Sequence, residues 1–132
     1  MDFNKVQEAL RRAVLSKRSL RQKLHGVYSG YLADVQQPRF PCVNYTFVDA
    51  TPVERYSTTA TCSLRVWVWS EKSYAECHDI LQQLLDVWHN KVLTFDGVYV
   101  SPLFLRLLDS GMDKPEKVYY VVTAWTLRWK EV

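Results

Sequence analysis

The stretch from Cys62 to Cys77, CSLRVWVWSEKSYAEC, decides the fold because a two-sided strand runs directly into the start of a helix. Alternate residues of a strand point to opposite faces. One face therefore carries Leu64, Val66 and Val68, and the other carries Arg65, Trp67 and Trp69. A half-buried strand should be polar on its solvent side. Here both sides are large and apolar, so something must cover the tryptophan side as well.

The second half of this stretch predicts a helix. Ser73 and Glu76 have the spacing of a capping box, which marks a helix N-terminus. Behind them, apolar residues recur at spacings of three and four, as on one buried helix face: Tyr74, Cys77, Leu81, Leu84 and Trp88. This is the clearest helical pattern in the chain, and we expect its apolar face to pack on a sheet.

Two further helical segments are expected before this strand. Residues 3–16 repeat apolar side chains at helical spacing, with Asp2 as the N-terminal cap. Ser19 and Gln22 form a second predicted capping box, and Gly26 is a stop signal. We therefore expect a short second helical turn whose Leu20 and Leu24 face inward.

The remaining segments predict strands. Pro38 and Pro41 exclude helix and mark an extended approach to a strand that includes residues 43–47. The polar segment TPVERYSTT, residues 51–59, separates it from the strand of about residues 60–70, which gives a hairpin with a long tip. The pair Asp96-Gly97 between two apolar runs predicts a tight hairpin.

The second strand of that tight hairpin continues past Pro102 through LFLRLLD, and SGMDKPEK, residues 110–117, reads as a loop. The last strand, VYYVVTAWTLRW, covers residues 118–129, and Trp125 and Trp129 share one of its faces. The order is therefore helix, two strands, helix, two strands, with one or two small additions. We predict one α+β domain, 1–132, in which a mainly antiparallel four- to five-stranded sheet carries two main helices on one face.

The aromatic residues of the sheet raise the question of partners. Each buried aromatic ring removes about 150–250 Å² from water, or about 4–6 kcal/mol as an upper limit. Either a long loop or another subunit must cover such rings, and we favour a subunit because the long loops are polar. The candidate interface residues are Arg55 and Tyr56 in the polar loop 50–59, with Trp67, Trp69, Trp125 and Trp129 on the strands.

Composition narrows the function classes. The chain has 132 residues, 48% of them hydrophobic, and no apolar run of the ~18 residues that a membrane span needs. The N-terminus lacks the pattern of a secretory signal, so we expect the chain to stay in the compartment where it is made. Three widely spaced cysteines indicate reduced, buried thiols. The net charge is +3, and residues 1–25 hold seven basic against two acidic residues, which leaves −2 for the rest.

No pattern in the sequence predicts catalysis. The three histidines, His25, His78 and His89, lack metal-ligand spacing, and no phosphate-binding or nucleophile motif occurs. Asp109-Ser110-Gly111 resembles the active-site triplet of aspartic proteases, but too little chain follows it for the rest of that fold. We interpret it as a strand that ends in a turn. The prediction is a protein that is not an enzyme and has no cofactor.

The element order resembles a known family. A proline-flanked strand, VYSGYLADVQQPRFPCVNYTFVD, precedes LRVWVWSEKSYAECHDILQQLLDVW, a strand that runs into a helix. The strands GVYVSPLFLRLLDS and YYVVTAWTLRW follow. From about Phe3 to Trp129 this is similar to the tail terminator proteins (tail completion, or tail-to-head joining) of long-tailed bacteriophages.

The resemblance implies a small structural subunit that assembles as a ring, usually a hexamer. Such a ring caps the tail tube, ends its growth and offers a surface to the neck proteins on the head side. It implies a place in the virion at the head-tail junction after assembly in the host cytoplasm, with genomic DNA passing through the centre without sequence-specific binding, and no membrane.

Two other functions stay open. One is a neck or head-closure ring protein of the same virion. The other is a single-stranded nucleic-acid-binding module, because Arg65 lies close to Trp67 and Arg128 lies next to Trp129 on strands that could stack bases.

Overall fold

The computed structural model describes residues 3–52, 59–115 and 117–131, with the backbone alone for 49–52 and 59. The helices are α1 (Phe3–Ser16), α2 (Arg18–Lys23), α3 (Tyr74–Trp88) and a short 3-10 helix η1 (Leu32–Asp34). The strands are β1 (Gly26–Ser29), β2 (Cys42–Pro52), β3 (Thr59–Ser70), β4 (Leu93–Phe95), β5 (Val98–Asp113) and β6 (Val118–Glu131).

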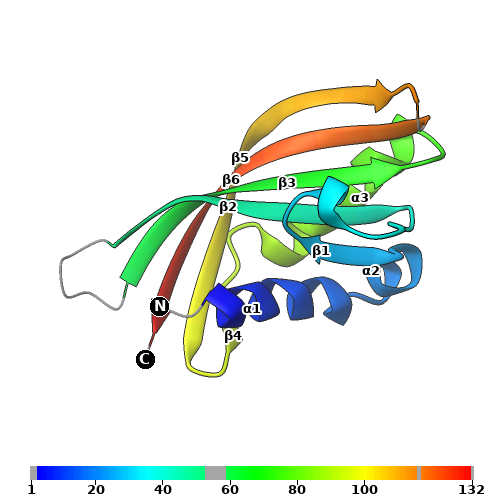
Figure 1. The fold of residues 1–132 in the computed structure, drawn as a ribbon. Helices are drawn as coiled ribbons and strands as arrows, with labels where there is room; N and C mark the ends of the chain where they lie inside the picture. The colour runs from blue at the N-terminus through cyan, green and yellow to red at the C-terminus, as the bar shows by residue number, and fades with distance from the viewer. Residues whose placement is uncertain (1–2, 53–58, 116, 132) are drawn as a thin grey trace.

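The strands form one curled sheet in the order β1-β2-β3-β6-β5-β4 (Figure 1). All neighbours are antiparallel except β1 and β2, which run parallel from Gly26↔Cys42 to Ser29↔Tyr45. The prediction of four to five strands was therefore wrong in detail, because the sheet has six and is mixed. Strand β1 has four residues, too few for an alternating pattern, and only its pairing with β2 makes it a strand.

The α-helices cover one face of the sheet, as predicted. Trp88 of α3 donates its indole N–H to the backbone carbonyl of Leu10 in α1 at 3.1 Å, which joins the two main helices. Trp88 also packs edge-on against Trp125 of β6, with ring centroids 5.5 Å apart. The indole N–H of Trp125 reaches Thr123 Oγ1 at 2.9 Å, and that hydroxyl donates to the carbonyl of Val66 at 3.1 Å. The core therefore lies between this face and the helices.

Two of the predicted interface residues belong to that core. Trp125 and Trp129 are 0% and 1% exposed, on the helix side of β6. Trp129 is packed against Phe3 of α1, with ring centroids 5.3 Å apart. Their assignment to a subunit interface was wrong, because the helices of the same chain cover them completely.

The local signals had mixed outcomes. Ser73 Oγ accepts the N–H of Glu76 at 3.1 Å, which confirms the cap of α3. Asp96 and Gly97 both have positive φ, 46° and 82°, which confirms the tight hairpin between β4 and β5. The capping box at Ser19 was wrong: Lys17 is the N-cap of α2, and the Ser19 hydroxyl donates to Gln83 of α3 instead. Asp2 lies outside the described residues.

Strand β5 is longer than predicted. It continues through residues 110–113, which we had assigned to a loop, and pairs with β6 as far as Asp113↔Val118. Asp109 therefore lies within a strand and not in a turn. Its Oδ1 accepts the backbone N–H of Ser110 at 2.8 Å, and Asp109 is exposed.

Candidate interaction surface

The sheet face opposite the helices is the candidate site, and we call it the outer face. The strand register places Asn44, Trp67, Val122 and Asp109 side by side across β2, β3, β6 and β5. The neighbouring row includes Trp69 and Tyr120, whose ring centroids are 5.3 Å apart. Trp67 and Trp69 thus point to the face predicted from their alternation.

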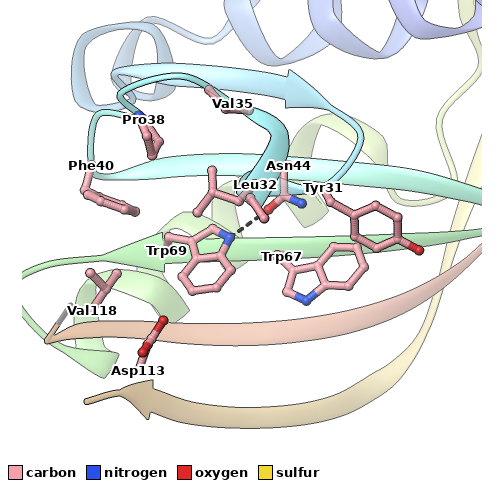
Figure 2. Close-up of a pocket in the computed structure, with 11 residues that line it drawn as sticks. Tyr31, Leu32, Val35, Pro38, Phe40, Asn44, Trp67, Trp69, Asp113 and Val118 are labelled. Carbon is pink, nitrogen blue, oxygen red and sulfur yellow. Dashed lines mark hydrogen bonds between the residues drawn. The ribbon is translucent and has the colours of Figure 1, made fainter. Parts of the chain in front are cut away.

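The chain itself provides part of the cover for these two tryptophans. The segment from Gly30 to Pro41, between β1 and β2, crosses the outer face (Figure 2). Together with the sheet it borders an open cavity of about 620 Å³. The lining residues are Tyr31, Leu32, Ala33, Val35, Pro38, Phe40, Asn44, Trp67, Trp69, Asp113 and Val118. Sequence reasoning missed this segment, because its prolines were read only as an approach to a strand.

Asn44 fixes the covering segment to the sheet. It is 1% exposed, accepts the indole N–H of Trp69 at 2.7 Å and donates to the carbonyl of Gly30 at 2.9 Å. Gly30 in turn donates its N–H to the carbonyl of Tyr45 at 2.8 Å. Its φ of 102° is a conformation that glycine adopts without strain, so the turn onto the outer face occurs at this residue.

The cover is incomplete. Trp67 and Trp69 remain half-buried, and Tyr31, whose ring centroid is 6.0 Å from that of Trp67, is 60% exposed. Asp113 lies at the edge of the cavity in Figure 2. The negative charge of Asp109 raises the pKa of the neighbouring Tyr120 hydroxyl. This end of the outer face is therefore an accessible aromatic cavity with carboxylates beside it.

The other end of the outer face is basic. Arg65 of β3 and Arg106 of β5 flank Ala124 of β6 in one row. Arg128 and Lys130 follow further along the same face of β6, and all four basic side chains are exposed. The surface thus has an aromatic, acidic end and a cationic end on adjacent parts of one sheet.

The predicted site residues therefore separate into three groups. Trp67 and Trp69 lie together on the accessible outer face, whereas Trp125 and Trp129 lie in the core. Arg55 and Tyr56 lie outside the described residues. Tyr31 and Phe40 line the same cavity and were not predicted as site residues. The apolar residues between Gly30 and Pro41 could have indicated that this segment packs against the sheet.

The described residues contain no cluster of three or more histidine, cysteine, aspartate or glutamate side chains able to hold a metal ion. Across residues 3–52, 59–115 and 117–131, no helix has the length and apolar character to cross a membrane.

Comparison with solved structures identifies the architecture. The chain superimposes on bacteriophage SPP1 gp17 protein with a TM-score of 0.60 and 19% identity, covering 98% of this chain and 90% of that chain. The chain has the fold of SPP1 gp17. It also matches a chain of the virion of a native gene transfer agent particle, with a TM-score of 0.71 and 11% identity over 96% of both chains. No family model matches the sequence, and no curated protein does.

The resemblance to bacteriophage tail proteins, predicted from the sequence, is thereby confirmed at the level of the fold.

Proposed function

We propose that this chain is a structural virion protein that forms a ring, hexameric in the manner of tail terminators, at the end of a phage tail tube. The ring caps the tube, ends its growth and joins it to neck proteins on the head side. Genomic DNA passes through the ring without sequence-specific contacts. The protein works as one domain, has no enzymatic activity and resides at the head-tail junction after assembly in the host cytoplasm.

The observation that carries this proposal is the fold shared with a chain of a gene transfer agent virion over 96% of both chains. The outer face supports it. Tyr31 is exposed and Trp67 is half-buried beside a cavity, and aromatic side chains are enriched at the centres of protein interfaces. Capping needs such a surface, since a ring subunit must contact both its neighbours and the tube.

The mass of the purified protein, measured by light scattering and native mass spectrometry with and without its tail tube protein, tests the proposal. We expect a ring-sized species in at least one condition. Trp67→Ala should weaken binding to the tube protein and leave the circular dichroism spectrum unchanged. Tyr99→Ala is the matched control, because Tyr99 is an exposed aromatic residue at the other end of the outer face. A monomer in both conditions contradicts the proposal, and binding only to head-side proteins favours a neck ring instead.

A second candidate, single-stranded nucleic-acid binding, is favoured by the row of exposed cations next to Trp67. Arg65 and Arg106 could contact phosphates while Trp67 stacks on a base. Fluorescence anisotropy with a labelled oligothymidine decides between the two. A nucleic-acid-binding module should bind the oligothymidine with an affinity that falls as salt is added and that is lost in Trp67→Ala. A ring subunit should bind it at most weakly, and that binding should not depend on Trp67.

A further inference from the structure

The part of β5 from Leu103 to Met112 exposes several large apolar side chains. Five large apolar residues within ten positions are each 38–55% exposed: Leu103, Leu105, Leu107, Leu108 and Met112. Single exposed leucines are normal on a protein surface, but a contiguous set marks an interaction site or an aggregation hazard. The four leucines do not line the hollows around Trp67 and Trp69, whereas Met112 borders one of them.

The same segment is a free edge of the sheet. Strand β4 pairs only with Val98–Val100 of β5. Beyond it, Asn90 donates to the carbonyl of Pro102, and His89 Nδ1 accepts the N–H of Phe104. From Leu105 to Asp113, β5 has β6 on one side and no other strand of the described chain on its second side. A free strand edge that carries exposed apolar side chains is a template for pairing with another strand.

The sheet has a second free edge. Strand β1 pairs only with Cys42–Tyr45 of β2, so the segment from Thr46 to Pro52 has β3 as its one neighbour among the described strands. Two different free edges on one chain allow a head-to-tail contact, in which an edge of one copy meets the other edge of the next. Contacts of this type form a ring when the rotation between copies closes and an open filament when it does not, whereas a contact between identical edges stops at a dimer.

We infer that the β5 edge from Leu105 to Asp113 binds the β2 edge from Thr46 to Pro52 of a second copy of this chain. This inference rests on the proposed ring and names the contact that builds it. Backbone hydrogen bonds would set the alignment of the two strands, and the exposed leucines would be buried on both sides of the new strand pair. The edge meets the aromatic cavity only near Asp113, so most of the cavity lining, including Tyr31 and Phe40, stays available for the tube or a neck protein.

The size of the edge agrees with such a contact. Nine residues of extended chain span about 30 Å. A standard interface buries about 800 Å² per partner, which corresponds to a patch about 28 Å across. The β5 edge is therefore long enough to extend across a standard subunit interface.

Charge substitution tests the role of the edge. Leu105→Lys and Leu107→Lys, made separately, should each raise the subunit dissociation constant by about tenfold or more, since a charge would be buried at the contact. Both side chains are exposed, so the subunit should keep its circular dichroism spectrum. Val92→Lys is the matched control, because Val92 is 67% exposed and lies outside the edge. Lysine variants that assemble like the wild type overturn the inference and leave the proposed function standing, whereas a wild type that is monomeric in all conditions overturns the proposed function itself.

Crosslinking identifies the partner edge. Tagged Leu108→Cys protein is mixed with Val48→Cys protein and treated with a short bismaleimide. The native thiols of Cys42, Cys62 and Cys77 are buried, and their burial raises each pKa, so they should not react. The expected main product joins the two different proteins. If the main product joins two Leu108→Cys chains, or if no crosslink forms in an assembled sample, the head-to-tail pairing is wrong.

Discussion

Asn44 shows how one buried polar side chain holds a surface feature in place. Its amide bridges Trp69 of β3 and Gly30 at the start of the covering segment, and every partner is remote in sequence. Because the site is buried, the donors and acceptors that Asn44 satisfies would otherwise lack partners. The position of the segment over Trp67 and Trp69 therefore depends on this residue more than on local propensity.

We predict that Asn44→Ala lowers the free energy of unfolding by about 1–3 kcal/mol, since it leaves the Trp69 N–H and the Gly30 carbonyl unpaired. Urea denaturation at neutral pH measures this loss. Tryptic cleavage after Arg39, within the covering segment, should also become faster than in the wild type. Ser63→Ala, at an exposed position of β3, is the control and should change neither quantity. Equal stability of the two variants would contradict the role assigned to Asn44.

At the scale of elements, α2 is held against α3 by three polar contacts along one side of α3. Lys23 binds Asp79 at 2.6 Å, Lys17 binds Asp86 at 2.8 Å, and Ser19 donates to Gln83 between them. Helix α2 has only six residues, which is too short to be stable alone. Its position therefore depends on buried Leu20 and on these contacts with α3.

The contact between Lys23 and Asp79 predicts a pH dependence. The hydrogen bond from Lys23 lowers the pKa of Asp79 below its ordinary value. A lowered pKa in the folded state contributes stability above the unfolded-state pKa of about 3.9, and this contribution is lost as the pH falls through the folded-state pKa. Asp79→Asn should therefore cost about 0.2–1 kcal/mol at pH 7, because the pair is solvent-exposed.

The cost should disappear as the pH falls below about 4 and Asp79 becomes protonated in the wild type. Chemical denaturation of both proteins between pH 7 and the acid transition measures it. Glu71→Gln, at an exposed position outside this contact, is the control and should not reproduce the effect. A constant difference between wild type and Asp79→Asn across the range would mean that the ion pair does not stabilise the fold.

The whole molecule consists of a sheet covered by helices on one face and by a short segment on part of the other (Figure 1). All three cysteines are enclosed by these layers. Burial raises the pKa of Cys42 to about 12, with a smaller contribution from Cys77, and raises the pKa of Cys62 and of Cys77 to about 11. The thiols therefore stay protonated in the fold at pH values at which unfolded cysteines ionise.

This difference predicts that stability falls in mild alkali. Above about pH 8.5 the unfolded chain loses thiol protons that the folded chain keeps, so the free energy of unfolding decreases as the pH rises. The slope is at most about 1.4 kcal/mol per pH unit for each cysteine. Urea denaturation between pH 8 and pH 10 should show a shallower slope in the variant Cys42→Ala, Cys62→Ala, Cys77→Ala. Parallel slopes would contradict the burial of these thiols.

The local features of the fold were predictable because they depend on neighbours in sequence. Helical spacing identified α1 and α3, Ser73 identified the start of α3, and Asp96-Gly97 identified a hairpin. Strand alternation also predicted that Trp67 and Trp69 share a face. Each of these signals reflects the period or the backbone preference of a single element, and a single element is encoded locally.

Only the tertiary structure decided what covers each face. Trp125 and Trp67 lie on apolar faces of neighbouring strands, yet Trp125 is in the core and Trp67 is accessible. The alternation of a strand separates its two faces but does not state which one the helices cover. Three features depend on contacts between residues far apart in the chain: the pairing of β1 with β2, the position of the segment over Trp69, and the free edge of β5. The residue pattern within one segment carries no information on such contacts.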